Sequence, residues 1–287
     1  MKHPQKWRET IDPFSFQYRC FRLTEVLGYP HAGNDVFYAK GTYDGREVTA
    51  FVKSARQTGA DIRNEISVIR QLGWPLAPEI IDCDEACEQF VVTLAKEGER
   101  LSVILGENAA LESKAYLHEY GQTLALLHSM LGDFAPVKDR RFFHAPESAL
   151  LKDTPIAFVS DWLACRQPRE RFRCFCHGDF HYANLLWKDG RLSAVLDFEL
   201  AGMGNRDFDI AWAMAVRPGQ RFFHTQEEAR VFFDGYASAG RYDIRAVRYF
   251  LAQIYAHFYL FSGNEPDYLR LIERTLRRLC SGEWLDF

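Results

Sequence analysis

One stretch of this chain carries four polar residues at fixed intervals around a short predicted hairpin. His177, Asp179 and Asn184 follow the spacing H-x-D-x-x-x-x-N, and Asp197 comes thirteen residues after Asn184. Apolar runs on both sides of a Gly-bearing turn at 188–190 are typical of paired strands, which would return Asp197 to the end where Asp179 and Asn184 lie. Carboxylate and amide oxygens gathered in one place suit Mg²⁺, which prefers oxygen ligands and binds with substrate phosphates. The stretch therefore predicts a site for a magnesium-bound polyphosphate.

The same pattern resembles the catalytic and metal-binding loops of the kinase-like superfamily. His-Gly-Asp at 177–179 and Asp-Phe-Glu at 197–199 stand where protein kinases have His-Arg-Asp and Asp-Phe-Gly. In this form the chain is similar to the aminoglycoside phosphotransferase and choline kinase-like branch, which phosphorylates small molecules. The resemblance runs from about Leu23 to Trp212. It implies an α+β, bilobal protein kinase-like fold, with an antiparallel sheet lobe that holds one helix and a larger, mainly helical lobe.

The N-terminal part of the chain reads as strands joined by short turns. Alternating apolar and polar residues predict strands at 21–28, 36–43 and 46–53. The loop between the first two contains Gly33 and Asn34, whose backbone N–H groups could cover phosphates as the nucleotide-positioning loops of kinases do. The loop lacks a GxGxxG pattern, so an ordinary turn fits it equally well.

A lysine at the end of the third predicted strand has a natural acidic partner. Asp61 is a good N-cap, and the isoleucines within 62–69 mark the buried stripe of the helix that follows. Glu65 flanks this stripe and faces inward, where an unpaired carboxylate would be costly. Lys53 is the candidate cation. The resemblance assigns this pair to the α- and β-phosphates of the nucleotide.

The last strand-like run, 90–95, leads into a polar segment that contains a glycine and predicts a hinge. We therefore expect a nucleotide-binding lobe at 1–95 and a catalytic and substrate-binding lobe at 96–287. In the family that the chain resembles, the backbone of the hinge contacts the purine. This points to Thr93 and Ala95.

Beyond the hinge the apolar residues repeat with a helical period. They predict an amphipathic helix over 117–131, a helix starting at 207–212, a buried helix at 247–261 and a final amphipathic helix at 269–279. Asp209 could cap the second of these or brace the catalytic loop. We favour the structural role.

The resemblance also implies a division of roles among the motif residues. Asp179 accepts or orients the proton of the substrate hydroxyl, while Asn184 and Asp197 hold Mg²⁺ against the phosphates. Lys53, fixed by Glu65, holds the α- and β-phosphates of ATP or GTP.

Two more residues have supporting roles in this interpretation. His177 is expected to brace the loop by hydrogen bonds. Glu199, where many kinases have glycine, could contact a second metal ion, the loop or a substrate amine, and the sequence leaves these three options open.

Composition excludes several classes of partner. A net charge of −4 and a pI near 6.2 give no global basic field, so we expect no nucleic-acid partner. No run of about 20 apolar residues predicts a membrane span, and the first residues lack a signal-peptide core. We therefore expect a cytoplasmic protein whose partner is a small molecule that bears a hydroxyl group. The sequence does not indicate an oligomeric state.

The cysteines do not predict a disulfide framework or a zinc site. Their number is seven, which is odd, and they are scattered along the chain. Cys83 with Cys87, or Cys174 and Cys176 with His177, lack a second pair at zinc-ribbon spacing. We expect reduced, structural thiols.

The acceptor is not fixed by the sequence. An aminoglycoside-type antibiotic would need a carboxylate-rich pocket, which acidic residues of the last third could form if they gathered in space: Asp234, Asp243, Glu265, Asp267, Glu283 and Asp286. An amino alcohol, an amino acid or a sugar is the alternative acceptor.

Two interpretations from other classes stay open. One is a metallo-phosphohydrolase that uses His177, Asp179, His181 and Asp197. The other is a catalytically inactive nucleotide-binding module on the same scaffold.

Overall fold

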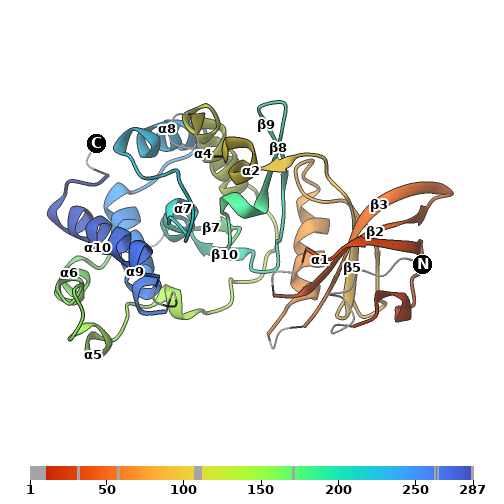
Figure 1. Ribbon diagram of the computed structural model, residues 1–287, viewed down its shortest axis with the longest axis horizontal. Coiled ribbons are helices and arrows are strands. Elements are labelled where there is room, and N and C mark those ends of the chain that lie inside the picture. The colour runs from red at the N-terminus through yellow and green to blue at the C-terminus, as the bar shows by residue number, and fades with distance from the viewer. Residues whose placement is uncertain are drawn as a thin grey trace. The chain divides into compact units, whose positions relative to one another are not determined.

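In the computed structural model the chain forms two compact units, whose elements are labelled in Figure 1. We call them the N-terminal unit (Met1–Gly98, Leu186–Lys188 and Ser193–Ala201) and the C-terminal unit (Glu99–Leu185, Asp189–Leu192 and Gly202–Phe287). The structure describes residues 11–30, 33–56, 59–106, 112–169, 172–261, 263 and 265–285. The predicted lobes are continuous stretches of sequence, whereas the N-terminal unit also contains parts of the predicted hairpin.

The N-terminal unit is built on an antiparallel sheet of five strands in the order β1-β2-β3-β5-β4. Buried residues alternate along β1 and β2, as expected for strands with one face on a core. Asp44 (φ 49°) and Gly45 (φ 71°) form the tight turn between β2 and β3. The strands span Phe21–Gly28 (β1), Asp35–Tyr43 (β2), Arg46–Ser54 (β3), Ile80–Cys83 (β4) and Phe90–Leu94 (β5).

One helix, α1 (Ile62–Leu72), packs on this sheet. It starts at the predicted cap, because the Asp61 side chain accepts a hydrogen bond from the Asn64 N–H. It ends at Gly73, whose left-handed backbone (φ 52°) closes the last turn. The isoleucine stripe packs against β4 and β5, as the periodicity predicts.

The predicted hairpin after Asn184 is present. Strands β8 (Leu185–Lys188) and β9 (Arg191–Val195) are joined at Asp189 and Gly190, which have φ values of 51° and 76°. Positive φ at both positions is the geometry of a two-residue hairpin turn.

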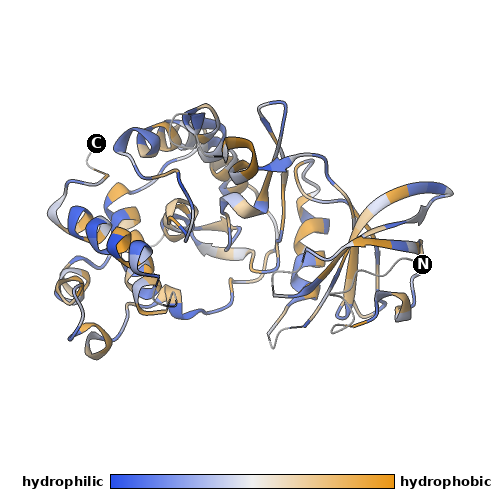
Figure 2. Cartoon of the chain, viewed as in Figure 1, coloured by the Kyte–Doolittle hydropathy of each residue, from blue (hydrophilic) through white to orange (hydrophobic). Residues whose placement is uncertain are grey.

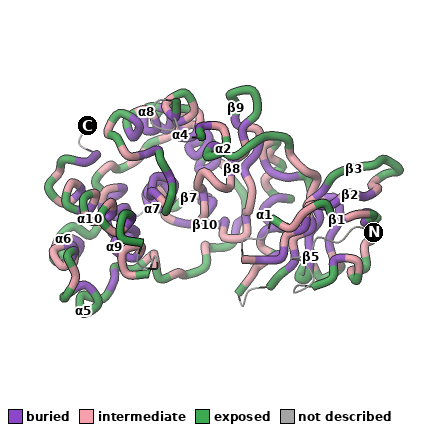
Figure 3. Tube along the Cα trace, viewed as in Figure 1, coloured by how far each residue is buried: buried purple, intermediate pink, exposed green. Residues whose placement is uncertain are grey.

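The C-terminal unit is mainly helical and contains one antiparallel strand pair, β7 with β10. Helix α7 is buried along nearly its whole length and is drawn largely in purple in Figure 3, whereas α10 alternates apolar and polar residues (Figure 2). The longer elements of the C-terminal unit are α4 (Lys114–His128), α6 (Phe158–Arg166), β7 (Arg173–Cys176), β10 (Gly202–Asn205), α7 (Arg206–Met214), α8 (Gln226–Ala237), α9 (Ile244–Phe261) and α10 (Pro266–Ser281). The short elements among the described residues are β6 (Glu99–Arg100), α2 (Leu101–Leu105), α5 (Ser148–Leu151) and the 3₁₀ turns η4 (Arg141–Phe143) and η5 (Tyr182–Asn184). The 3₁₀ turn η2 (Pro13–Ser15) belongs to the N-terminal unit.

Helices α4 and α8 cross closely because each has a glycine at the contact. A Cβ on Gly121 would lie 2.0 Å from the Phe232 carbonyl oxygen, and a Cβ on Gly235 would lie 1.9 Å from that of His118. Only residues without a side chain allow two backbones to approach in this way.

The structure corrects one helix boundary. The helix predicted over 117–131 is α4, which begins at Lys114 and ends at His128. Leu131 keeps the apolar spacing but lies outside the helix and is 96% exposed. The buried helix predicted at 247–261 is confirmed as α9. Within the described part of the chain, no helix has both the length and the apolar character that crossing a membrane requires.

Candidate active site

In the N-terminal unit, one lysine is surrounded by three carboxylates. The Lys53 Nζ lies 2.7 Å from Glu65 Oε2, 2.7 Å from Asp197 Oδ1 and 2.9 Å from Glu199 Oε2. The end of β3, the first turn of α1 and the segment after β9 supply these groups. We call these four residues the lysine cluster. The predicted pair of Lys53 and Glu65 is present in it.

The lysine cluster carries an excess of negative charge. Burial alone lowers the pKa of Lys53, but attraction to Glu65, Asp197 and Glu199 outweighs it and raises the pKa, so the ammonium stays protonated. Burial raises the pKa of the Glu65 carboxyl, and Lys53 opposes the rise. Oxygens of the three carboxylates lie within 4.8 Å of one another. The charge of one ammonium group does not balance the charge of three carboxylates, so a further cation would be attracted to this cluster.

Asp197 presents its carboxylate from a strained backbone. Its φ of 65° is unusual for a residue with a Cβ, and the next side chain, Phe198, is fully buried. The Asp197 side chain is 44% exposed although its oxygen touches Lys53. Such strain occurs where the surrounding structure holds a functional group in place.

Glu199 contacts the loop before β2 and the start of α1. Its Oε2 accepts a hydrogen bond from Asn34 Nδ2 (2.6 Å) and its Oε1 accepts one from the Asp61 N–H (2.9 Å). The backbone carbonyl of Glu199 accepts another from Asn64 Nδ2 (2.9 Å). These contacts involve the loop before β2, and a role of Glu199 toward a second metal ion or a substrate amine stays a prediction. Together with its contact to Lys53, these hydrogen bonds make Glu199 a link within the unit.

The predicted phosphate-covering residues lie in this loop. Gly33 has a φ of 113°, and the Asn34 side chain is engaged, because its Oδ1 also accepts a hydrogen bond from the Arg56 N–H (3.2 Å). Residues 31 and 32 of the loop lie outside the described residues. Contact of the Gly33 and Asn34 N–H groups with phosphates stays a prediction.

Thr93 and Ala95, the predicted purine contacts, lie at the end of β5. Thr93 pairs with Phe51 of β3 and Ile80 of β4. The Ala95 N–H donates to the Thr49 carbonyl (3.0 Å), so this N–H is already used within the sheet. The contact with a purine stays a prediction.

In the C-terminal unit, three side chains hold the Asp179 carboxylate. Trp212 Nε1 donates to Oδ1 (2.7 Å) and Asn184 Nδ2 donates to Oδ2 (3.2 Å). His181 Nε2 lies 3.5 Å from Oδ2. Its Nδ1 accepts from the Ala183 N–H, which leaves the proton of the neutral ring on Nε2. Because the Asn184 amide nitrogen faces Asp179, its Oδ1 is the atom left for a metal ion.

These donors keep Asp179 ionised. Burial alone would raise the pKa of this carboxyl, but the hydrogen bond from His181, the positive charge of Arg217 and the hydrogen bond from Trp212 together lower it well below its usual range. A carboxylate in this state orients a hydroxyl group and accepts its proton late in a reaction.

Asp209 braces the loop from behind. Its Oδ2 accepts hydrogen bonds from the His177 N–H (2.9 Å) and His128 Nε2 (3.1 Å), and its Oδ1 accepts one from the Gly178 N–H (3.0 Å). The cap of α7 is Asn205. Of the two options for Asp209, the structure therefore has the brace.

His177 acts within the same loop. The side chain is fully buried, and its Nδ1 accepts a hydrogen bond from the Asp179 N–H (3.2 Å). Gly178 between them has a φ of 78°, and its carbonyl accepts a hydrogen bond from Arg140 Nη2 (2.6 Å).

Three of the residues beside Asp179 were not identified as site residues from the sequence. They are Arg140, Trp212 and Arg217; each guanidinium carbon lies 5.2 Å from the centre of the indole ring. Trp212 stands three positions after Asp209, so the two share a face of α7. That spacing is the signal from which Trp212 could have been found.

The structure changes the grouping of the cysteines. Cys174 and Cys176 lie with Sγ atoms 3.8 Å apart, and the histidine close to them is His128 instead of His177. Both ring nitrogens of His128 are already hydrogen-bonded, to Tyr236 and Asp209. All seven cysteines are free thiols.

Among the described residues of the C-terminal unit, His177, Asp179 and His181 of the phosphohydrolase interpretation do not form a ligand group. In the described part of the whole chain, the groups that could hold a metal are Glu65 with Asp197 and Glu199, and His128 with the cysteine pair.

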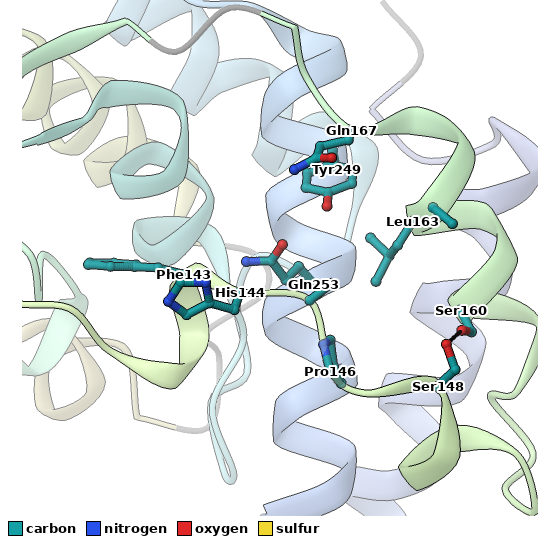
Figure 4. Close-up of a pocket in the computed structure, with 11 residues that line it drawn as sticks. Phe143, His144, Pro146, Ser148, Ser160, Leu163, Gln167, Tyr249 and Gln253 are labelled. Carbon is teal, nitrogen blue, oxygen red and sulfur yellow. Dashed lines mark hydrogen bonds between the residues drawn. The ribbon is translucent and has the colours of Figure 1, made fainter.

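A cavity of about 240 Å³ lies in the C-terminal unit beside the segment that follows Arg140 (Figure 4). Phe143, Tyr249, Leu163 and Gln253 are among the side chains around it. Its lining includes amide and hydroxyl groups and no carboxylate: Phe143, His144, Ala145, Pro146, Ser148, Ser160, Leu163, Ala164, Gln167, Tyr249 and Gln253.

Several solved structures of small-molecule kinases share this fold. The amicoumacin kinase hAmiN aligns with a TM-score of 0.60 and 12% identity, covering 93% of this chain and 91% of that chain. The aminoglycoside phosphotransferase APH(4)-Ia aligns with a TM-score of 0.62 and 16% identity, covering 90% and 94%. The choline kinase LicA from Streptococcus pneumoniae aligns with a TM-score of 0.58 and 14% identity, covering 91% and 94%.

These likenesses confirm the predicted α+β, protein kinase-like fold, with its antiparallel sheet in one unit and its helices mainly in the other. No curated protein sequence matches the chain. Residues 29–250 match the family model described as the phosphotransferase enzyme family (APH), and the chain therefore belongs to that family.

Proposed function

We propose that this protein transfers the γ-phosphate of ATP or GTP to a hydroxyl group of a small molecule, with Mg²⁺ as the metal ion. The observation that carries this proposal is the Asp179 carboxylate, which lies within 3.5 Å of nitrogen atoms of Trp212, Asn184 and His181. Positioning of this kind is the main contribution that a protein makes to phosphoryl transfer.

The lysine cluster suits the nucleotide side of the reaction. Lys53 is a cation fixed by Glu65. The negative charge that the three carboxylates of the lysine cluster carry in excess would be balanced by a bound metal ion. Asp197, half-exposed, and the Oδ1 of Asn184 would hold Mg²⁺, an ion that prefers oxygen ligands. When bound, Mg²⁺ neutralises charge on the phosphates.

Asp179 suits the acceptor side. Its ionised carboxylate would accept a hydrogen bond from the acceptor hydroxyl and take up the proton as the phosphate bond forms. Trp212 and Asn184 each bind one of its oxygens, which limits rotation of the carboxylate. Asp209 and His177 fix the backbone beneath it. All groups needed for turnover are present, which favours an enzyme over an inactive nucleotide-binding module.

Ligands in the similar structures support the choice of substrates. The amicoumacin kinase structure contains AMP-PNP, Ca²⁺ and Ami, and an APH(4)-Ia structure contains AMP-PNP and hygromycin B. An aminoglycoside-type antibiotic is one acceptor class for this chain, and an amino alcohol, amino acid or sugar is the alternative.

The test is Mg²⁺-dependent release of ADP from ATP, or GDP from GTP, against a panel of aminoglycosides, macrolides, choline, homoserine and methylthioribose. We expect acceptor-stimulated turnover that Asp179→Asn lowers by at least about 10³-fold, with the Kd for nucleotide changed less than about 3-fold. Near-normal turnover in this variant would remove Asp179 from its role. Failure of the wild type to bind Mg·ATP or Mg·GTP would refute the proposal.

A further inference from the structure

Two arginines lie beside the residue proposed to orient the acceptor. Trp212 Nε1 donates to Asp179 Oδ1 at 2.7 Å. The guanidinium carbons of Arg140 and Arg217 each lie 5.2 Å from the centre of the same indole ring. Two positive charges therefore stand next to one ionised carboxylate.

Arg140 has a structural task. Its Nη2 donates to the Gly178 carbonyl at 2.6 Å, and its guanidinium also lies 4.9 Å from the Phe143 ring centre. This hydrogen bond holds the loop that carries Asp179. Its positive charge still acts on any ligand that enters beside Trp212.

Arg217 has an unused donor. Its Nη1 donates to the Trp212 carbonyl (3.3 Å) and the Ala215 carbonyl (2.6 Å) at the end of α7. Its Nη2 is shielded from solvent and has no hydrogen-bond partner among the described residues. A shielded guanidinium N–H without an acceptor costs free energy, and a ligand oxygen would supply the missing partner.

The backbone beside Arg217 is held firmly. The Val216 N–H donates to the Tyr255 hydroxyl (3.0 Å), and the Tyr268 hydroxyl donates to the Val216 carbonyl (2.7 Å). Both tyrosines are buried and come from α9 and α10. A guanidinium on such a frame is preorganised, so little ordering free energy is lost when it binds an anion.

Two of the acidic residues that might have formed a pocket for a polycation lie at opposite ends of one helix. Asp267 lies in the first turn of α10, and Glu283 lies beyond the last residue of this helix. Because α10 has 16 residues, it is about 24 Å long. The candidates that the structure describes are all exposed: Asp234, Asp243, Glu265, Asp267 and Glu283. Asp286 lies outside the described residues.

Two cavities of the C-terminal unit have few carboxylates among the described residues that line them. The cavity of Figure 4 has none in its lining. A second cavity, of about 340 Å³, has Asp139 in its lining together with Arg173. Asp139 is already paired with His144 at 2.7 Å. Neither cavity offers the acidic walls that a polycationic antibiotic requires.

The geometry points to an acceptor that carries an anionic group, a carboxylate or a phosphate, near its reactive hydroxyl, with Arg217 as the residue that binds this group. This inference rests on the proposed function and names its substrate class. The fork of N–H groups on arginine matches the oxygens of carboxylates and phosphates. The positive pair disfavours aminoglycosides, whose ammonium groups it repels.

The test compares acceptors that share a carbon skeleton and differ in charge. The three-carbon series is serinol, glycerol, glycerate and glycerol phosphate, and the six-carbon series is glucosamine, glucose and gluconate, with kanamycin added. We expect kcat/KM, measured by Mg²⁺-dependent ADP release, to be about 10–100-fold higher for an anionic acceptor than for the cation of its series. Glycerate against glycerol phosphate separates a carboxylate site from a phosphate site.

Variants assign the preference to one residue. Arg217→Gln should lower kcat/KM for the anionic acceptors about 10–100-fold more than for the neutral ones of the same series, while Arg217→Lys restores part of this difference. Arg221→Gln, which changes an exposed arginine four positions later, is the matched control and should alter neither. Thermal unfolding of each variant checks that it is folded.

A binding measurement covers the case in which no acceptor of either series is turned over. Malonate, in Mg²⁺-free buffer, should raise the Tm of the wild type and of Arg221→Gln, and raise that of Arg217→Gln much less. Equal shifts in all three proteins, or no shift in the wild type, would overturn the inference. So would faster turnover of kanamycin or serinol than of the anions. If Mg·ATP does not bind at all, it is the proposed function that fails.

Discussion

Replacing Lys53 by methionine would show what the lysine cluster contributes to stability. The substitution keeps most of the side-chain volume and removes the cation shared by Glu65, Asp197 and Glu199. A single contact at 2.7 Å is worth about 6 kcal/mol before desolvation at an effective dielectric constant of about 20. Breaking a buried ion pair costs about 3–5 kcal/mol net. We expect a loss of that size at pH 7.5.

The loss should depend on pH in a defined direction. Without the lysine, carboxylates within 4.8 Å of one another repel by about 3.5 kcal/mol per pair, and the pKa of the Glu65 carboxyl, which burial already raises, loses the opposing attraction of Lys53. A folded-state pKa above the unfolded value means that stability falls as pH rises between the two values. Lowering the pH from 7.5 to 5 should therefore recover part of the lost stability.

The assay is urea or thermal unfolding of wild type and Lys53→Met at pH 5.0, 6.0 and 7.5, with and without Mg²⁺. Lys40→Met is the control, because Lys40 pairs with Glu47 at 2.8 Å on the surface, where an ion pair contributes little to stability, so its loss should stay small at every pH. Added Mg²⁺ should stabilise Lys53→Met more than the wild type. A loss in Lys53→Met that is the same at all three pH values would refute the electrostatic reasoning.

Three further predictions concern the C-terminal unit. Because the pKa of Asp179 is lowered, its protonation should produce no acid limb in the kcat profile between pH 5 and 8, which a pH–rate series measures directly. Trp212→Phe removes the hydrogen bond to Asp179 Oδ1, so the pKa of Asp179 should rise and kcat should fall about 10-fold, with an acid limb at higher pH than in the wild type; an unchanged profile would contradict this role. Gly235→Ala places a Cβ 1.9 Å from the His118 carbonyl oxygen, and chemical denaturation should show a loss of about 3 kcal/mol or more, whereas retention of wild-type stability would mean that the two helices separate freely.

Local patterns were sufficient for most of the N-terminal unit. Alternating apolar residues indicated β1, β2 and β3, and the Asp61 cap with its isoleucine stripe indicated α1. Strand β4 was missed because Ile80–Cys83 is four residues long and buried residues follow one another in it without alternation. A run this short carries no period.

Boundaries and long-range partners are harder to predict because they depend on tertiary contacts. Leu131 continues the apolar spacing of α4, yet the helix ends before it, so spacing alone misplaced the end. Arg140 and Arg217 lie outside the regular helices and reach Trp212 from separate segments of the chain. No periodicity in the sequence could have brought them together.

Helix α7 holds both the backbone of the loop at 177–179 and the Asp179 carboxylate that this loop carries. Asp209 binds the backbone of His177 and Gly178, and Trp212, three positions later, binds the carboxylate of Asp179. Because these two side chains leave the same rigid helix, the distance between the brace and the carboxylate is fixed by helix geometry. A shift of α7 would therefore move the loop backbone and the Asp179 side chain together. The orientation of Asp179 thus depends on the packing of α7 against α9, far along the chain from the H-x-D-x-x-x-x-N motif itself.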